Sequence, residues 1–291
     1  MLDLKKFVQQ VRVCDGAWGT EMQKRGLSAG AAPELWNTER PEAVEDVARG
    51  YVQAGSDVIL TNTFGGNRFV LERHNAGDRA GELAEAAAKL SRKAAGEDVK
   101  VFGSMGPTGK VVMMQETPPE QIREAFAEQA SALARGGVDA IVLETFNELA
   151  ELRLALEAAT DATDLPVVAC MTFASGAERM ATMMGEGPGD LLAACEELGA
   201  DAVGANCGLG PDNYVKVARA FREASSLPIW IKANAGLPQI GPGGETVFPM
   251  PADEFGQHVP ALVDAGANIL GGCCGTDPNY VRAIRSAVDA L

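Results

Sequence analysis

Four segments of the chain repeat one short pattern, and this repetition limits the folds that the chain can adopt. Each segment has a Gly, one further residue, an Asp or Asn, an apolar run and a polar end; the four are AGSDVILTNTF, GGVDAIVLETF, LGADAVGANCG and AGANILGGCCG. A Gly in this position is typical of a helix end, and a short apolar run bounded in this way is typical of a buried strand. The pattern therefore predicts repeated units in which a helix leads into a strand.

The same alternation runs through the whole chain, because short β-branched runs are separated by longer Ala-rich amphipathic stretches. This alternation predicts a parallel sheet with helical crossovers. We expect eight strands, at residues 11–14, 58–61, 100–103, 140–143, 166–171, 202–205, 228–231 and 268–270. Eight units without a linker or a break in composition predict a single-domain (β/α)8 TIM barrel over residues 1–291. The alternative is an open doubly wound sheet, which the count of eight disfavours.

Charge and hydropathy exclude two classes of partner. The chain has 25 Lys and Arg against 40 Asp and Glu, a formal charge of −15, which repels nucleic acid and anionic membranes. Its apolar runs are far shorter than the roughly 20 residues that cross a bilayer. The N-terminal stretch has no apolar core of a signal peptide. We therefore expect a cytoplasmic protein with no nucleic-acid or membrane partner.

Three of the six cysteines follow predicted strands. Cys207 comes after the sixth strand, and Cys273 and Cys274 come after the eighth. The carboxyl ends of barrel strands meet at one mouth, where the active site lies, so these three thiols are expected to converge. Three protein ligands are typical of a zinc ion with one position open for substrate. The other cysteines, Cys14, Cys170 and Cys195, lie within strand or helix runs and are expected to be buried structural residues.

A zinc ion bound by three thiolates suits the activation of a substrate thiol. A free thiol with a pKa of about 8.5 is mostly protonated at neutral pH, and coordination to zinc deprotonates it. The sequence thus favours a thiolate nucleophile that attacks a methyl group. Asn234, after the seventh strand, could occupy the open zinc position until substrate arrives, or could serve only the turn before Gly236.

Two carboxylates also follow predicted strands. Asp15 and Glu144 are placed to bind a substrate ammonium group, as an amino acid would offer. The alternative is structural, with Asp15 capping the turn before Gly16 and Glu144 capping the helix from Asn147. Both carboxylates at one mouth favour the binding role.

One loop and both histidines have simpler interpretations than catalysis. The loop GSMGPTGK offers backbone N–H groups to an anion, but Ser104 and Val111 break the P-loop pattern, so a carboxylate is the expected ligand. His74 and His258 fall in helical or loop stretches away from the strand ends, which favours surface positions.

Seven motifs together resemble the homocysteine S-methyltransferase family, closest to the homocysteine-binding module of cobalamin-dependent methionine synthase. They are DGAWGTEM, NTFGGN, GSMGPTG, ETFNELAE, GANCG, KANAGLP and GGCCGTDP, and they span nearly the whole chain. The resemblance implies methylation of homocysteine to methionine. It also implies the site: zinc on Cys207, Cys273 and Cys274, the substrate amino group on Asp15 and Glu144, its carboxylate near Gly16 and Ser104, and Asn234 as a zinc ligand when substrate is absent.

The expected methyl donor is a methylcorrinoid, such as methylcobalamin, on a separate carrier protein, since the sequence has no D-x-H-x-x-G corrinoid motif. The alternatives are S-methylmethionine and betaine. Such onium donors usually need an aromatic cage, and of three Trp and three Tyr only Trp18 lies near a strand end. Residues 180–184 are richer in Met than is typical of the family, and their role is not predicted.

Two further hypotheses differ in class. Lys232 follows an apolar run and could form a Schiff base, as in barrel aldolases, although this leaves the three thiols unexplained. The chain could also bind homocysteine or zinc without catalysing transfer. Turnover of homocysteine to methionine separates the second hypothesis from an enzyme.

Overall fold

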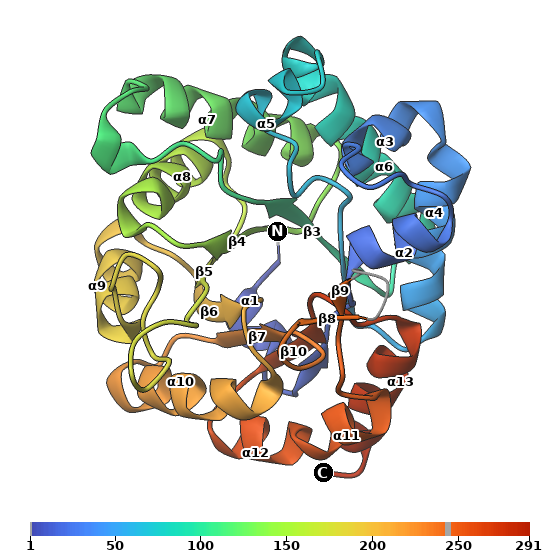
Figure 1. The fold of residues 1–291 in the computed structure, drawn as a ribbon, viewed down its shortest axis with the longest axis vertical. Helices are drawn as coiled ribbons and strands as arrows, with labels where there is room; N and C mark the ends of the chain where they lie inside the picture. Colours follow the sequence, from blue (N-terminus) through green and yellow to red (C-terminus); the bar gives the residue numbers. More distant parts are fainter. Residues whose placement is uncertain (1, 242–245) are drawn as a thin grey trace.

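Eight parallel strands form a barrel with helices around its outside, in a computed structural model that describes residues 2–241 and 246–291 (Figure 1). The strands are β1 Arg12–Val13, β2 Val58–Leu60, β3 Lys100–Met105, β4 Ala140–Phe146, β5 Val167–Met171, β6 Ala202–Asn206, β7 Ile229–Ala233 and β10 Ile269–Gly272. Their hydrogen-bonded order is β1-β10-β7-β6-β5-β4-β3-β2, and a parallel bridge between Cys14 and Val58 joins the two ends. The predicted (β/α)8 barrel is confirmed, and the open sheet is excluded.

Helices connect the strands on the outer face of the barrel (Figure 1). They are α2 Trp18–Lys24, α3 Trp36–Glu39, α4 Pro41–Gln53, α5 Arg68–Glu72, α6 Ala80–Ala95, α7 Pro119–Arg135, α8 Leu149–Ala162, α9 Pro188–Leu198, α10 Pro211–Ala224, α11 Ala252–Gln257, α12 Val259–Asp264 and α13 Pro278–Asp289. Short 3-10 turns lie at Pro33–Leu35, Gly77–Arg79 and Val112–Met114, and a small hairpin follows β7, with strands β8 Gln239–Ile240 and β9 Thr246–Val247. No helix among residues 2–241 and 246–291 is long and apolar enough to cross a membrane.

The repeated Gly and the Asp or Asn have the same structural role in each of the four units. The four glycines have φ between 76° and 102°, the left-handed conformation that ends a helix; they are Gly55, Gly137, Gly199 and Gly266. Two residues later, a side-chain oxygen accepts a hydrogen bond from a backbone N–H at the start of the neighbouring strand. The pairs are Asp57 with Val13, Asp139 with Val101, Asp201 with Val167 and Asn268 with Ile229, at 2.7 to 2.9 Å. The repeat therefore fixes both the helix end and the position of the next strand.

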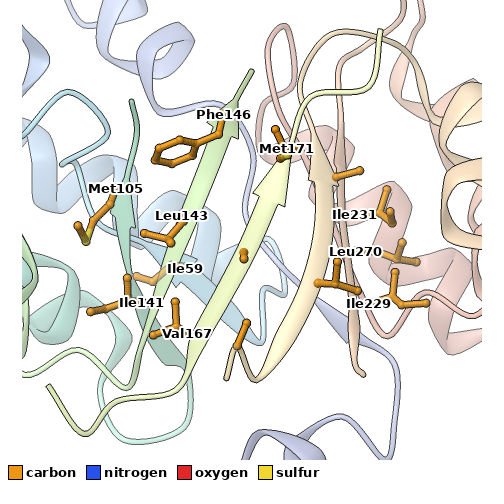
Figure 2. Packing of buried hydrophobic residues seen from close by; sticks show 14 of the residues in the cluster. Ile59, Met105, Ile141, Leu143, Phe146, Val167, Met171, Ile229, Ile231 and Leu270 are labelled. Carbon is orange, nitrogen blue, oxygen red and sulfur yellow. The ribbon is translucent and has the colours of Figure 1, made fainter. Parts of the chain in front are cut away.

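Alternate residues of each strand face the barrel interior and the helices. On β4, Ile141 and Leu143 belong to the shell between barrel and helices, to which Ile229 and Ile231 of β7 also belong (Figure 2). The interior holds a separate cluster, in which Phe102 and Trp230 stack with ring centroids 5.7 Å apart. Helix α1, Leu4–Phe7, contributes Leu4 to this interior cluster.

The polar residues of the site continue the inward-facing rows of these strands. Ser104, Glu144 and Lys232 each stand two residues after an interior residue, so they form a polar layer above the apolar interior. Several strands extend further than expected, and these three residues lie within strands rather than after them. Continued parallel pairing is the cause, as at Asn206 with Lys232.

Candidate active site

The thiols of Cys207, Cys273 and Cys274 lie together at the mouth of the barrel. Their Sγ atoms are all within 4.8 Å of one another, and those of Cys207 and Cys274 are 3.8 Å apart. Ligand sulfurs of a tetrahedral zinc site with Zn–S bonds of about 2.3 Å are separated by roughly 3.8 Å. The three thiols are not joined by disulfides. Their spacing and chemistry therefore fit a zinc ion.

The backbone around the thiols is held in an uncommon conformation. Cys207 has φ of 64°, which a residue with a Cβ adopts rarely and which is found preferentially at functional sites. The hydroxyl of Tyr214 lies 2.6 Å from the carbonyl oxygen of Cys207. On the opposite side, Cys273 N–H donates to the carbonyl of Ala233. The backbone on both sides of the cluster is thus held by neighbouring strands and helices.

The cluster already favours one thiolate. Hydrogen bonds from Cys273 and Cys274 lower the pKa of Cys207 to about 3. The hydrogen bond with Cys207 in turn raises the pKa of Cys274 to about 12. One thiolate held by two thiols is the arrangement that a cation would convert into three thiolates.

A cavity of about 610 Å³ opens above the three thiols. This volume is within the range of small-molecule sites. Its polar lining near the thiols includes Ser104, Glu144, Thr145 and Lys232, whereas Asp15 is not among the lining residues. The cavity therefore brings together most of the residues predicted from the strand ends.

The carboxylate of Asp15 is buried and accepts hydrogen bonds from other residues of the chain. Oδ1 accepts a hydrogen bond from Lys232 Nζ at 2.6 Å, and Oδ2 accepts from Trp18 Nε1 at 2.8 Å and from Leu60 N–H at 2.7 Å. Cys14 Sγ lies 3.3 Å from Oδ1. A direct contact between Asp15 and a substrate ammonium stays a prediction, and the observed partner of this carboxylate is Lys232.

Glu144 lies on the inward face of β4 and lines the cavity. Its Oε1 accepts a hydrogen bond from Ser104 Oγ at 2.5 Å. Burial raises the pKa of Glu144, while the charge of Lys232 and this hydrogen bond act in the opposite direction. The hydroxyl of Ser104 thus orients Glu144, and the expected position of Ser104 near a substrate carboxylate stays a prediction.

Asn234 and Gly16 lie beside the metal-binding candidates. Oδ1 of Asn234 accepts a hydrogen bond from Cys274 N–H at 3.1 Å, so this amide orients the turn that carries Cys274. Gly16 lines the cavity, and a Cβ there would lie 2.8 Å from Oγ1 of Thr276. Thr276 bonds to the carbonyl of Cys273 and to Ala17 N–H, and thereby links the two loops.

The loop GSMGPTGK binds carboxylates, but those of helix α8 and the residue before it. Thr108 N–H, within the motif, donates to Glu151 at 2.7 Å, and just beyond the motif the N–H groups of Val112 and Met113 donate to Glu148 at 2.9 Å. These N–H groups are consequently not free for a substrate carboxylate. The carboxylates observed on this segment therefore belong to the chain, and binding of a substrate carboxylate by the rest of the loop stays a prediction.

Several cavity residues were not predicted. His74 was expected away from the strand ends, yet it lines the cavity together with Glu34 and Phe64. Glu34 lies in the 3-10 turn Pro33–Leu35, Phe64 between β2 and α5, and His74 just after α5, and the periodicity of the strands does not reveal these positions. Thr145 has φ of 66°, and its N–H donates to Asn206 Oδ1 at 2.8 Å. Its position follows from a break in the register of β4 and β5.

The sequence matches the family model for homocysteine S-methyltransferase over residues 12–288. The chain belongs to this family. Similar curated proteins include the methionine synthases of Mycobacterium leprae, 34% identical over 98% of the chain, and of Mycobacterium tuberculosis, 35% identical over 96% of the chain. The chain spans about a quarter of the length of these relatives, 25% in each case.

Solved structures support the same fold. The homocysteine methyltransferase MmuM from Escherichia coli, in its metallated form, has a TM-score of 0.79 at 21% identity, over 98% of this chain and 99% of that one. A methyltransferase from Methanosarcina mazei has a TM-score of 0.62 at 16% identity, over 97% and 94% of the two chains.

Proposed function

We propose that this enzyme methylates homocysteine to methionine, with zinc on Cys207, Cys273 and Cys274 and a methylcorrinoid on a separate protein as donor. The observation that carries the proposal is the set of three thiol groups within 4.8 Å of one another at the base of the cavity. Zinc bound there would lower the pKa of the substrate thiol, so that the thiolate is available at neutral pH.

The residues of the chain have separable roles in this proposal. The cavity excludes water from the acceptor sulfur, and Glu144 binds the substrate ammonium group. Ser104 and Asn234 orient Glu144 and the Cys273–Cys274 turn through their hydrogen bonds. Lys232 is an unsuitable Schiff-base nucleophile: although burial acts to lower its pKa, the charge of Asp15 prevails and raises it, so the amine stays protonated.

The face of the barrel that carries the cavity supports a protein-borne donor. Among the described residues, nine of the ten exposed large apolar side chains lie in loops that follow strands of the barrel. They are Phe64, Val111, Met113, Met114, Met183, Met184, Leu237, Ile240 and Val247. Exposed apolar groups gathered on one face are typical of a protein interaction surface. The similarity to methionine synthases agrees with a corrinoid donor.

The test combines zinc analysis with a donor screen. The purified protein should hold about one zinc per chain, as expected for a single three-thiolate site. Replacing Cys207, Cys273 or Cys274 singly by Ala should remove both zinc and methionine formation. Cys195→Ala is the matched control and should keep both, because Cys195 is buried in the helical shell. Stoichiometric zinc in all three ligand variants would show that the ligand assignment is wrong.

The donor is tested by supplying homocysteine with methylcobalamin, S-methylmethionine or betaine in parallel and measuring methionine. Methylcobalamin, free or on a carrier protein, should support turnover. Turnover with an onium donor and none with methylcobalamin would reject the corrinoid. It would point instead to the aromatic groups Trp18 and Phe64, which share the cavity.

A further inference from the structure

Lys232 is a buried cation in the cavity that methyl transfer to zinc-activated sulfur does not by itself require. Its side chain is 3% exposed and lines the cavity beside Glu144. A lysine ammonium carries three N–H donors. Within residues 2–241 and 246–291, Asp15 Oδ1 is its one hydrogen-bond partner. Burying polar N–H groups without partners is costly, so an anionic ligand in the cavity is expected.

Asp15 fixes the position of this ammonium group. The carboxylate is immobilised by Trp18 and Leu60, which bond to Oδ2, while Lys232 bonds to Oδ1. The pair is formally neutral, because one positive and one negative charge lie 2.6 Å apart. Asp15 therefore occupies one N–H donor of the Lys232 ammonium group and fixes its position, so that the other two donors are available to another acceptor.

Glu144 offers the opposite charge from another strand. Glu144 lies on β4 and Lys232 lies on β7. Burial has the largest effect on the pKa of each group, and the charge of each group also shifts the pKa of the other. An α-amino acid carries an ammonium and a carboxylate on one carbon. A cavity floor with one cation and one anion is complementary to that zwitterion.

We infer that Lys232 binds the α-carboxylate of the thiol substrate while Glu144 binds its ammonium group, and that Asp15 positions Lys232. This inference rests on the proposed function, since the substrate sulfur must lie at Cys207, Cys273 and Cys274. It adds Lys232 as a residue that selects amino-acid thiols over simple thiols.

The experiment measures the affinity of the zinc-loaded protein for three thiols by calorimetry. The probes are 1-butanethiol, 4-mercaptobutanoate, which keeps the carboxylate, and 3-mercaptopropylamine, which keeps the ammonium. The variants are Lys232→Met and the double variant Asp15→Asn/Lys232→Met, which removes both charges of the pair and avoids an unpaired buried carboxylate. Glu144→Gln is the matched control for the opposite charge.

The wild type should bind both charged thiols more tightly than 1-butanethiol. Both Lys232 variants should lose about tenfold or more in affinity for 4-mercaptobutanoate, with 1-butanethiol unchanged. Glu144→Gln should lose affinity for 3-mercaptopropylamine instead.

Two results would overturn the inference. One is an equal loss for all three thiols in the Lys232 variants, which indicates a structural role. The other is wild-type binding of 4-mercaptobutanoate no tighter than that of 1-butanethiol, a result that needs no variant to fold. If none of the thiols binds the zinc-loaded wild type, the proposed function itself fails.

Discussion

The ionised form of Glu144 carries a cost to folding. Burial raises the pKa of this carboxyl above its ordinary value of 4.5, although Lys232 and Ser104 oppose the effect. A carboxyl group with a raised folded-state pKa destabilises the native protein above that pKa and has no such cost below the unfolded value. A charged carboxylate in the substrate cavity thus lowers the free energy of unfolding, a trade-off that is common at active sites.

We therefore expect Glu144→Gln to increase the free energy of unfolding at pH 7. The gain should shrink as the pH falls through the raised pKa towards 4.5. Urea denaturation at several pH values measures it, and exposed Glu223, changed to Gln, is the control that should have little effect. Lower stability of Glu144→Gln at pH 7 would show that the buried carboxylate is stabilising.

At the scale of the element, the repeated helix–strand units depend on one side-chain hydrogen bond each. Oδ2 of Asp201, at the start of β6, accepts a hydrogen bond at 2.9 Å from Val167 N–H of β5. Asn268 makes the equivalent bond to Ile229 with an amide oxygen. The charge of Asp201 is thus dispensable to the bond, and the oxygen is required.

Asp201→Ala should lower the free energy of unfolding by about 1 kcal/mol, because Val167 N–H loses its partner at the edge of the barrel. Asp201→Asn keeps an acceptor oxygen and should cost much less. Denaturant titration of both variants gives the comparison. Equal losses would mean that charge, rather than the hydrogen bond, is the source of the stabilisation.

At the scale of the whole molecule, the exposed apolar side chains gather on the face that carries the active site. This face includes four methionines with exposed fractions from 41% to 77%, namely Met113, Met114, Met183 and Met184. Methionine side chains adapt well to partner surfaces. We propose that Met183 and Met184, of the Met-rich segment 180–184 whose role the sequence does not predict, belong to a docking surface for the donor protein.

Changing these four methionines to Gln should reduce methyl transfer from a corrinoid carrier protein about tenfold, because a rim cluster of apolar contacts is lost. Affinity for homocysteine should not change, since the methionines do not line the cavity. Leu291→Gln is the matched control, because Leu291 is exposed but lies at the chain terminus. Steady-state kinetics with the carrier protein and calorimetry with homocysteine separate the two effects. An unchanged rate of methyl transfer would show that the four methionines are not part of the docking surface.

The sequence determined the barrel and the position of its mouth. Gly and Asp recur before the strands because each helix must end and each strand must be aligned with its neighbour. Residues after parallel strands must emerge at one end, so Cys207, Cys273, Cys274 and Glu144 could be placed together from strand order alone.

Only the tertiary structure decided which of these groups pair. Asp15 and Lys232 are 217 residues apart, and nothing in either motif shows that their strands bring them within 2.6 Å. The N–H groups of the loop after β3 likewise find Glu148 and Glu151 at the start of α8. Periodicity tells which face a side chain takes, whereas its partner depends on packing across the barrel, where buried donors and acceptors must all be satisfied.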